Sequence, residues 1–342
     1  MKDALLHTPW LSLAAAATLP FSVLMYVLLD GTDLGVGVLL AGEPDAGRRE
    51  TMIDSILPVW DGNETWIVLG GGGMLALFPG VYGALLTALY PVCFAMLFAL
   101  IVRGVAIACR GMAGRRAAAW CDALLLAGSA VAAFSQGVLI GALVQGVRTR
   151  GGVFVGSPWD WASGFSLFCG LALVTGYAWL GACWLIWRTV GSQQQRARRW
   201  SIGLGAGTAL GTALVSIWTL RLDGRYADRW LVESGPGAIA CATAIFAALG
   251  VVFAVAIARR RGVAPLVAAL LWFSFALACV VWTVFPLLLP PSVTIEAGSA
   301  PPRTQAFVMA GASVLVPAVL IYSTFAFRVF RGKILPPGAP RG

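Results

Sequence analysis

The chain has 342 residues, of which 59% are hydrophobic and only 11% are charged. This composition excludes an ordinary soluble domain and indicates a protein that crosses a membrane several times. The net charge of +9 does not indicate nucleic-acid binding, because the basic residues cluster at the ends of apolar runs and form no soluble basic domain. The runs are continuous rather than alternating, which favours membrane-spanning helices over a β-barrel.

Nine stretches are candidates for membrane-spanning helices. The second opens with polar residues and contains Gly70 to Gly73, so eight spans remain an alternative. We interpret this glycine run as a packing surface. The first stretch is too long for the hydrophobic segment of a signal peptide. In chain order the predicted spans are 11–40, 57–78, 80–108, 118–146, 160–187, 200–220, 236–258, 264–290 and 306–329.

The distribution of Lys and Arg predicts the orientation of these spans. With nine spans and an outer N-terminus, 16 basic residues fall on inner segments and 7 on outer ones, while Arg103 lies within the third span. Such a bias is typical of the cytoplasmic side. With only eight spans, Arg48 and Arg49 would lie on the opposite side from the later basic clusters, so the charge distribution favours nine.

Four carboxylates lie within the predicted membrane region, where each one costs several kcal/mol unless it is paired or functional. Asp30 and Asp33 lie near the inner end of the first span, and Asp61 and Glu64 near the start of the second. The i,i+3 spacing places each pair on one helix face. Because a short loop joins the two helices, we expect all four carboxylates to converge at one depth.

The residues alone leave the role of this acidic cluster open between a proton path, a cation site and helix capping. Capping explains Asp61 near a helix start but explains Asp30 and Asp33 poorly. Arg103 either extends its side chain to the surface or pairs with one of the acids. We expect Asp122 to cap the start of the fourth span.

Small and polar neighbours accompany the acids. We expect the glycines of these two segments to allow close helix approach or local unwinding, and Trp60 and Asn63 to provide supporting polar groups. The glycines are Gly31, Gly35, Gly37 and Gly62.

Residues that commonly bind redox metals are scarce. The only histidine, His7, precedes the first span, whereas a bis-histidine haem needs two and a haem–copper centre needs several. No nucleotide-binding loop or nucleophile triad is present. We therefore expect no redox metal centre in this chain, and we interpret the cysteines as buried free thiols because none forms a Cys-x-x-Cys motif. They are Cys93, Cys109, Cys121, Cys169, Cys183, Cys241 and Cys279.

Two motifs carry a family resemblance. At Asp30-Gly31-Thr32-Asp33-Leu34-Gly35-Val36-Gly37 and at Pro58-Val59-Trp60-Asp61-Gly62-Asn63-Glu64-Thr65-Trp66 the chain resembles subunit II of the cytochrome bd-type quinol oxidases. This is the CydB family, including its cyanide-insensitive branch. Further similar stretches lie at 135–147 and 285–292, and the resemblance covers nearly the whole chain.

The resemblance implies an all-α fold with a first four-helix bundle at about 11–146 and a second four-helix bundle together with an extra helix at about 160–329. It implies a periplasmic N-terminus, a cytoplasmic tail at 330–342 and a place in the bacterial inner membrane. It also implies a heterodimer with a CydA-like subunit I, which carries two b haems, haem d and the quinol site. A small single-helix subunit can join this complex, which oxidises quinol and reduces dioxygen to water with cytoplasmic protons.

In this family subunit II is haem-free, and some members hold a structural quinone; a bound phospholipid is an alternative. Asp33 and Asp61 match the acidic positions of the family's proton path, and Asp30 matches the first acid of its motif. Glu64 stands where some members have Gln, and Thr32 replaces an aromatic residue. The outer loop at 221–236 is shorter than in some relatives.

Two rival interpretations remain. A stand-alone secondary transporter could use the same acids to bind protons or cations. A purely structural subunit would only stabilise its partner, without any role for the acids in proton transfer.

Overall fold

The structure is a computed structural model that describes residues 9–329 and 332–334. His7, Lys2 and most of the predicted cytoplasmic tail lie outside these residues. Within the described part, each of the nine predicted spans contains a long helix. The long helices are α2 (Trp10–Leu39), α4 (Trp60–Leu77), α5 (Pro79–Arg110), α6 (Arg115–Gln145), α7 (Gly164–Arg188), α8 (Gly191–Leu222), α10 (Pro236–Ala258), α11 (Ala264–Val284) and α13 (Pro302–Val329).

Short elements connect the long helices at both ends of the molecule. Two antiparallel pairs of strands, β1 with β2 and β3 with β4, lie in the connections that follow α6 and α11. The elements are η1 (Leu40–Gly42), α3 (Ala46–Asp54), β1 (Thr149–Arg150), β2 (Val153–Phe154), α9 (Gly224–Asp228), the π-helical turn η2 (Arg229–Glu233), β3 (Leu287–Leu289), β4 (Val293–Thr294) and α12 (Ile295–Gly298).

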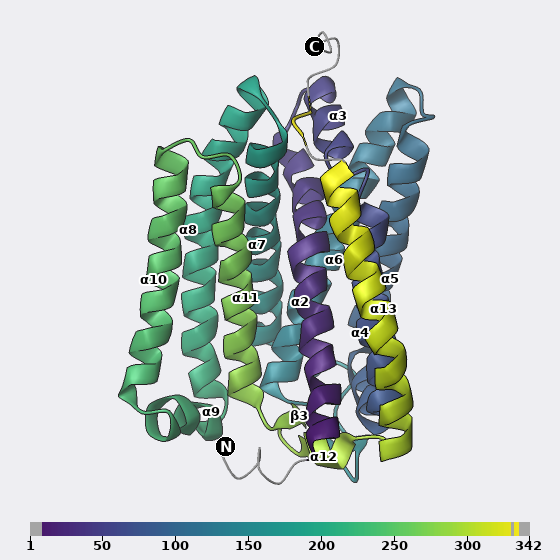
Figure 1. The fold of residues 1–342 in the computed structure, drawn as a ribbon, viewed down its shortest axis with the longest axis vertical. Coiled ribbons are helices and arrows are strands. Elements are labelled where there is room, and N and C mark those ends of the chain that lie inside the picture. The colour runs from purple at the N-terminus through teal and green to yellow at the C-terminus, as the bar shows by residue number, and fades with distance from the viewer. Residues whose placement is uncertain (1–8, 330–331, 335–342) are drawn as a thin grey trace.

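Eight of the helices in the described residues are long and apolar enough to cross a membrane, and α4 is the long helix that is not among them. Consecutive long helices alternate in direction. Both α2 and α13 therefore run from the end of the molecule that carries α9 and α12 to the end that carries α3 (Figure 1). We call these the α9 end and the α3 end. The chain is accordingly a multi-pass membrane protein.

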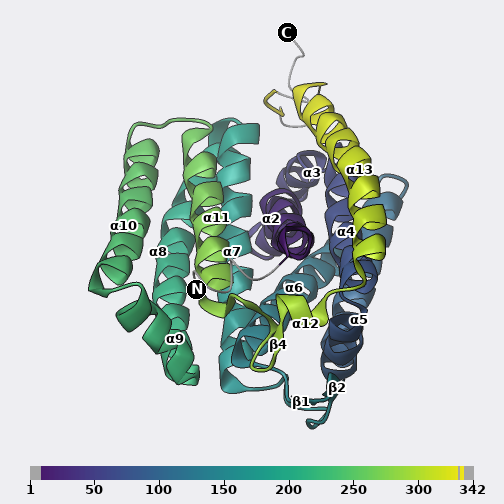
Figure 2. The ribbon, with the colours of Figure 1, turned by 60° about the horizontal axis from the view of Figure 1, so that its bottom comes forward.

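The long helices form two groups (Figures 1 and 2). Helices α2, α4, α5 and α6 make up the first, and α7, α8, α10 and α11 make up the second. Helix α13 packs against α4 and α2, while α7 packs against both α2 and α6. This arrangement confirms the predicted all-α class of two bundles with an additional helix.

The two bundles meet where α2 crosses α7 without intervening side chains. A Cβ atom at Gly35 would overlap the Tyr177 carbonyl, and one at Gly181 would overlap the backbone at Gly35. A Cβ atom at Gly37 would likewise overlap the Ser129 side chain of α6. The predicted close helix approach is therefore confirmed for these glycines of α2, because only a residue without a side chain fits there.

The glycine run of α4 behaves differently from the prediction. A Cβ atom at Gly71, Gly72 or Gly73 would meet no other atom of the described chain within 4 Å. A Cβ atom at Gly70, by contrast, would lie 3.5 Å from Ser22 of α2. The interpretation as a packing surface within this chain therefore holds for Gly70 and is wrong for Gly71, Gly72 and Gly73.

Two helix boundaries also differ from the prediction. Helix α8 begins at Gly191 rather than at 200, because the polar residues before the apolar run continue the helix beyond it. Helix α11 ends at Val284 rather than at 290, because Pro286 lacks the N–H that a helix interior needs. The sequence after Pro286 forms β3 and β4 instead.

All seven cysteines are free, as predicted, but they are not all buried. Cys121, Cys169 and Cys183 are buried, whereas Cys109 and Cys241 are exposed on the outer faces of their helices. An apolar run shows that a helix lies in the membrane but does not show which of its faces meets lipid.

Replacing Gly35 by Ala tests the contact between the bundles. We expect Gly35→Ala to cost about 1–3 kcal/mol, because the added methyl group overlaps the backbone of α7. The measurement is the unfolding midpoint of the detergent-solubilised protein. Gly203→Ala is the matched control, since Gly203 faces open space in α8; equal midpoints for the two variants would contradict the tight crossing.

Candidate functional site

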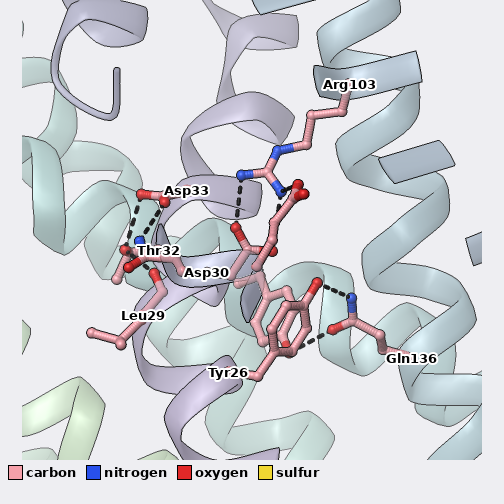
Figure 3. Close-up of polar contacts among 10 residues, drawn as sticks. Tyr26, Leu29, Asp30, Thr32, Asp33, Arg103 and Gln136 are labelled. Atoms are coloured by element: carbon pink, nitrogen blue, oxygen red, sulfur yellow. Dashed lines mark hydrogen bonds and ion pairs between the residues drawn. The ribbon is translucent and has the colours of Figure 1, made fainter. Parts of the chain in front are cut away.

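A buried arginine lies at the centre of the polar cluster (Figure 3). Arg103 of α5 is fully buried, and its Nη2 and Nη1 atoms lie 2.7 and 3.0 Å from the two carboxylate oxygens of Asp30 in α2. Nη1 also lies 3.0 Å from Oε1 of Glu64 in α4. The pairing alternative for Arg103 is confirmed, and extension of its side chain to the surface is wrong.

Asp33 lies one turn further along α2 and has only neutral neighbours in hydrogen-bond contact. The Asn63 side-chain amide of α4 donates a hydrogen bond to Asp33 Oδ2 at 2.7 Å. The Thr32 hydroxyl lies 3.4 Å from Oδ1, while it donates to the Leu29 carbonyl at 2.7 Å. Asp33 is fully buried, so its charge cannot be stabilised by water at the surface.

The cluster holds more acids than bases. Asp30 and Glu64 share the single guanidinium of Arg103, whereas Asp33, one turn away on α2, contacts Asn63 instead. A buried carboxylate without a compensating positive charge is costly. The arrangement is therefore chemically suited to taking up a proton or a cation.

Asp61 does not join this cluster. Its side chain is exposed on the first turn of α4, and it makes no hydrogen bond or ion pair with any residue that the structure describes. Residues at i and i+3 differ by about 60° around a helix. Because Glu64 already lies at the edge of the buried face, that rotation turns Asp61 outward, and the expected convergence of four carboxylates is wrong for Asp61.

An amide bridge between two tyrosines extends the polar core toward the second bundle. The Tyr177 hydroxyl of α7 donates to Gln136 Oε1 at 2.8 Å, and Gln136 Nε2 of α6 donates to the Tyr26 hydroxyl at 3.0 Å. Tyr26 lies one turn before Asp30 on α2 (Figure 3). Sequence reasoning assigned none of these three residues a role, although an amide in the middle of an apolar run was the available signal.

Other predicted residues contribute in ways the sequence did not show. Asp122 lies two turns inside α6, where it pairs with Arg49 at 2.9 Å and Arg110 at 2.5 Å. The expected capping role is wrong, because α6 already begins at Arg115.

Trp60, which was expected to provide a supporting polar group, is half-buried. Its ring lies beside Gly104, the residue that follows Arg103 in α5.

No role was predicted from the sequence for Glu43, which lies at the α3 end. It is almost fully buried and lies 2.8 Å from Arg48 and 3.6 Å from Arg196 of α8. This acid joins the connection after α2 to the second bundle. The sequence signal was weak, because a carboxylate in a connecting segment is ordinarily solvated.

No group of three or more His, Cys, Asp or Glu side chains among the described residues could hold a metal ion. The second bundle contains a cavity of about 290 Å³ between α7, α8, α10 and α11 and the adjoining part of α6. Its walls are mainly apolar and include Phe165, Phe246, Trp272 and Phe273. Such walls suit an apolar ligand rather than a charged one.

Comparison with known proteins gives a consistent assignment. The family model for cytochrome bd terminal oxidase subunit II matches residues 11–330. Cytochrome bd-I ubiquinol oxidase subunit 2 of Escherichia coli strain K12 is 29% identical over 350 residues, covering 90% of this chain and 91% of that protein. Cytochrome bd ubiquinol oxidase subunit 2 of Bacillus subtilis strain 168 is 31% identical over 201 residues, covering 57% of each chain.

A solved structure shows the same fold. The structure of bd oxidase from Geobacillus thermodenitrificans contains a chain that matches with a TM-score of 0.77 and 19% identity. The match covers 94% of this chain and 99% of the other. The agreement extends through both bundles.

Neutralising Arg103 tests the polar cluster. We expect Arg103→Gln to destabilise the protein by about 3–5 kcal/mol, because it leaves buried carboxylates without a positive partner. Adding Asp30→Asn should recover part of this loss by removing one uncompensated charge. Thermal unfolding in detergent measures both effects; Arg115→Gln, on the exposed start of α6, is the control. A midpoint for Arg103→Gln equal to that of the control would refute the central role of the pair.

Proposed function

Because the chain belongs to the family of cytochrome bd terminal oxidase subunit II, we propose that it is the haem-free subunit of a quinol:dioxygen oxidoreductase complex in the bacterial inner membrane. In this proposal a CydA-like subunit I carries two b haems, haem d and the quinol site, and a small single-helix subunit can join them. Reduction of dioxygen to water consumes protons. This chain supplies part of the path that brings them from the cytoplasm.

The observation that carries the proton-path proposal is the fully buried Asp33 with only neutral hydrogen-bond donors beside it. Asp30 is held in a two-point ion pair with Arg103, which suits a fixed structural charge. Asp33 has no such partner, so it can bind and release a proton without breaking an ion pair. Glu64 is half-buried beside Arg103 and links this core to the edge of α4.

The distribution of basic residues supports a cytoplasmic α3 end, the end at which the acidic cluster lies. Basic residues are the usual mark of that side of the membrane. Those at the α3 end are Arg48, Arg49, Arg110, Arg115, Arg116, Arg188, Arg196, Arg198, Arg199, Arg259, Arg260, Arg261, Arg328 and Lys333, against Arg148, Arg150, Arg221, Arg225, Arg229 and Arg303 at the α9 end.

The outer face of α4 supports contact with subunit I. Asp61, Thr65, Val68, Gly72 and Leu75 are all exposed, and their alternating spacing of four and three residues places them on one helix face. An uncompensated carboxylate facing lipid would cost several kcal/mol. We infer that subunit I covers this face and that protons pass there from this chain to its partner.

The cavity in the second bundle suits a structural quinone or the acyl chains of a phospholipid, because its walls are mainly apolar. The competing function is a stand-alone transporter that uses the same cluster to bind protons or cations. A transporter would be stable and colourless when purified alone. An oxidase subunit should copurify with a haem-bearing chain.

Neutralising Asp61 tests transfer to the partner. We expect Asp61→Asn to lower quinol oxidase turnover by about a hundredfold, the low end of what a positioned proton-transfer group contributes. Haem content should stay normal, as measured by the absorption spectrum of the complex purified through this chain. Asp228→Asn, an exposed acid at the α9 end, is the control. Wild-type turnover in Asp61→Asn would remove Asp61 from the path.

Exchanging the partners of the buried hydrogen bond separates proton transfer from structural support. We expect Asp33→Asn to lower turnover strongly and the double change Asp33→Asn with Asn63→Asp to restore much of it. The double variant returns a carboxylate to the same buried hydrogen bond, whose length is 2.7 Å. Turnover is measured at equal haem content. If both variants keep full turnover, the acids serve assembly only, as a purely structural subunit requires.

A further inference from the structure

Five arginines form a basic patch at the α3 end of the second bundle. They come from the first turns of α8 and from the turn between α10 and α11, which lie at the same end of the molecule (Figure 1). Arg198 is half-buried and the other four are exposed. We call this patch the second-bundle basic rim; it consists of Arg198, Arg199, Arg259, Arg260 and Arg261.

The rim is held together by backbone contacts. The two terminal nitrogens of Arg198 lie 3.5 Å from the carbonyls of Ile257 and Arg261, which ties α8 to the turn after α10. The turn closes with hydrogen bonds from Arg261 N to the Ala256 carbonyl at 3.0 Å and from Arg260 N to the Ile257 carbonyl at 3.1 Å. Arg260 takes a φ of 51° there, a conformation that ordinarily favours glycine. The three consecutive arginines are therefore presented from a defined turn.

Within residues 9–329 and 332–334, these charges have no carboxylate partner. None of the five arginines forms an ion pair with a residue that the structure describes. The sequence has no Asp or Glu from 161 to 222, from 234 to 295, or after Glu296. In the first bundle, by contrast, Glu43 and Asp122 pair with the nearby arginines.

The positive field extends to the end of the described chain. The Lys333 ammonium donates to the carbonyls of Ile186 and Thr189 at the end of α7. Burial, and then the positive charges of Arg198 and Arg188, lower the pKa of Lys333 below its usual value. Positive groups this close together repel one another. An anion bound beside them at the membrane surface would reduce that repulsion.

The surface next to the rim is apolar. Val251, Val252 and Val255 of α10 are exposed, and a Cβ at Gly203 of α8 would meet no atom within 4 Å. Within residues 237–258 of α10, Phe253 and Ala256 are buried, and the other residues are exposed or half-buried. A positive rim directly above exposed apolar helix faces matches a molecule with an anionic head and hydrocarbon chains.

We propose that the second-bundle basic rim binds the phosphodiester headgroup of an anionic phospholipid, whose acyl chains lie along α8 and α10. Guanidinium groups match phosphate oxygens in geometry and charge, and basic groups at a membrane surface attract anionic lipids. The rim lies outside the acidic cluster. The proposal therefore does not depend on the function assigned to that cluster.

The test measures binding of phosphatidylglycerol and phosphatidylcholine to the complex, purified whole through this chain, by native mass spectrometry. We expect tighter binding of phosphatidylglycerol by the wild type. Replacing both Arg259 and Arg260 by Gln should weaken its binding about 25-fold, since each basic group contributes about fivefold. The change of Arg115 and Arg116 to Gln removes the same charge at the same end, outside the rim, and should change binding less than twofold.

A second variant changes the same two positions but keeps their charge, which separates a loss of lipid binding from a loss of folding. With Arg259→Lys and Arg260→Lys the charge remains, so phosphatidylglycerol binding should stay within about fivefold of the wild type. If phosphatidylglycerol binding falls equally in the Arg259/Arg260 variant and in the Arg115/Arg116 control, the whole basic surface attracts the lipid and the proposal is overturned. Unchanged phosphatidylglycerol binding in the variant with Gln at 259 and 260 would also overturn it. So would a result in which this variant loses a copurifying protein chain but keeps its lipid.

Discussion

The paired charges of Arg103 and Asp30 are the interaction on which the rest of the structure depends. They join α5 to α2 inside the first bundle with contacts of 2.7 and 3.0 Å, and Glu64 adds α4 to the same guanidinium. Once this cation is buried, its surroundings must remain polar, because a buried charge is costly unless charged or hydrogen-bonding groups compensate it. Asn63 and Gln136 then satisfy the polar groups on either side of the pair.

Much of the fold could be predicted from the sequence, because the length and continuity of apolar runs report directly on membrane helices. The positions of Asp30, Asp33 and Glu64 near one end also followed from helix spacing. The rotation of α4 did not, since i,i+3 spacing establishes a shared face but not the direction in which that face points. Asp61 therefore lies outside the cluster. The partners of Asp122 and Gln136 come from distant segments, and no local pattern encodes such contacts.

Helix α4 separates two environments within a few residues. Asn63 is buried against α2, Glu64 lies at the boundary, and Asp61 is exposed. The close crossing of α2 and α7 at Gly35 holds the opposite side of α2 in place. The acidic cluster is thus supported on one side by the second bundle and opens, through α4, on the other.

The length of α4 has a consequence for the surrounding lipid. Its 18 residues correspond to about 27 Å of helix, and its first turn carries polar groups, so its apolar portion falls short of a hydrocarbon layer of about 30 Å. A bilayer adapts to such hydrophobic mismatch by thinning locally. Where lipid borders α4 beside the proposed contact with subunit I, headgroups and water would then lie closer to the midplane than elsewhere around the protein, which shortens the anhydrous distance between the α3 end of α4 and the aqueous phase.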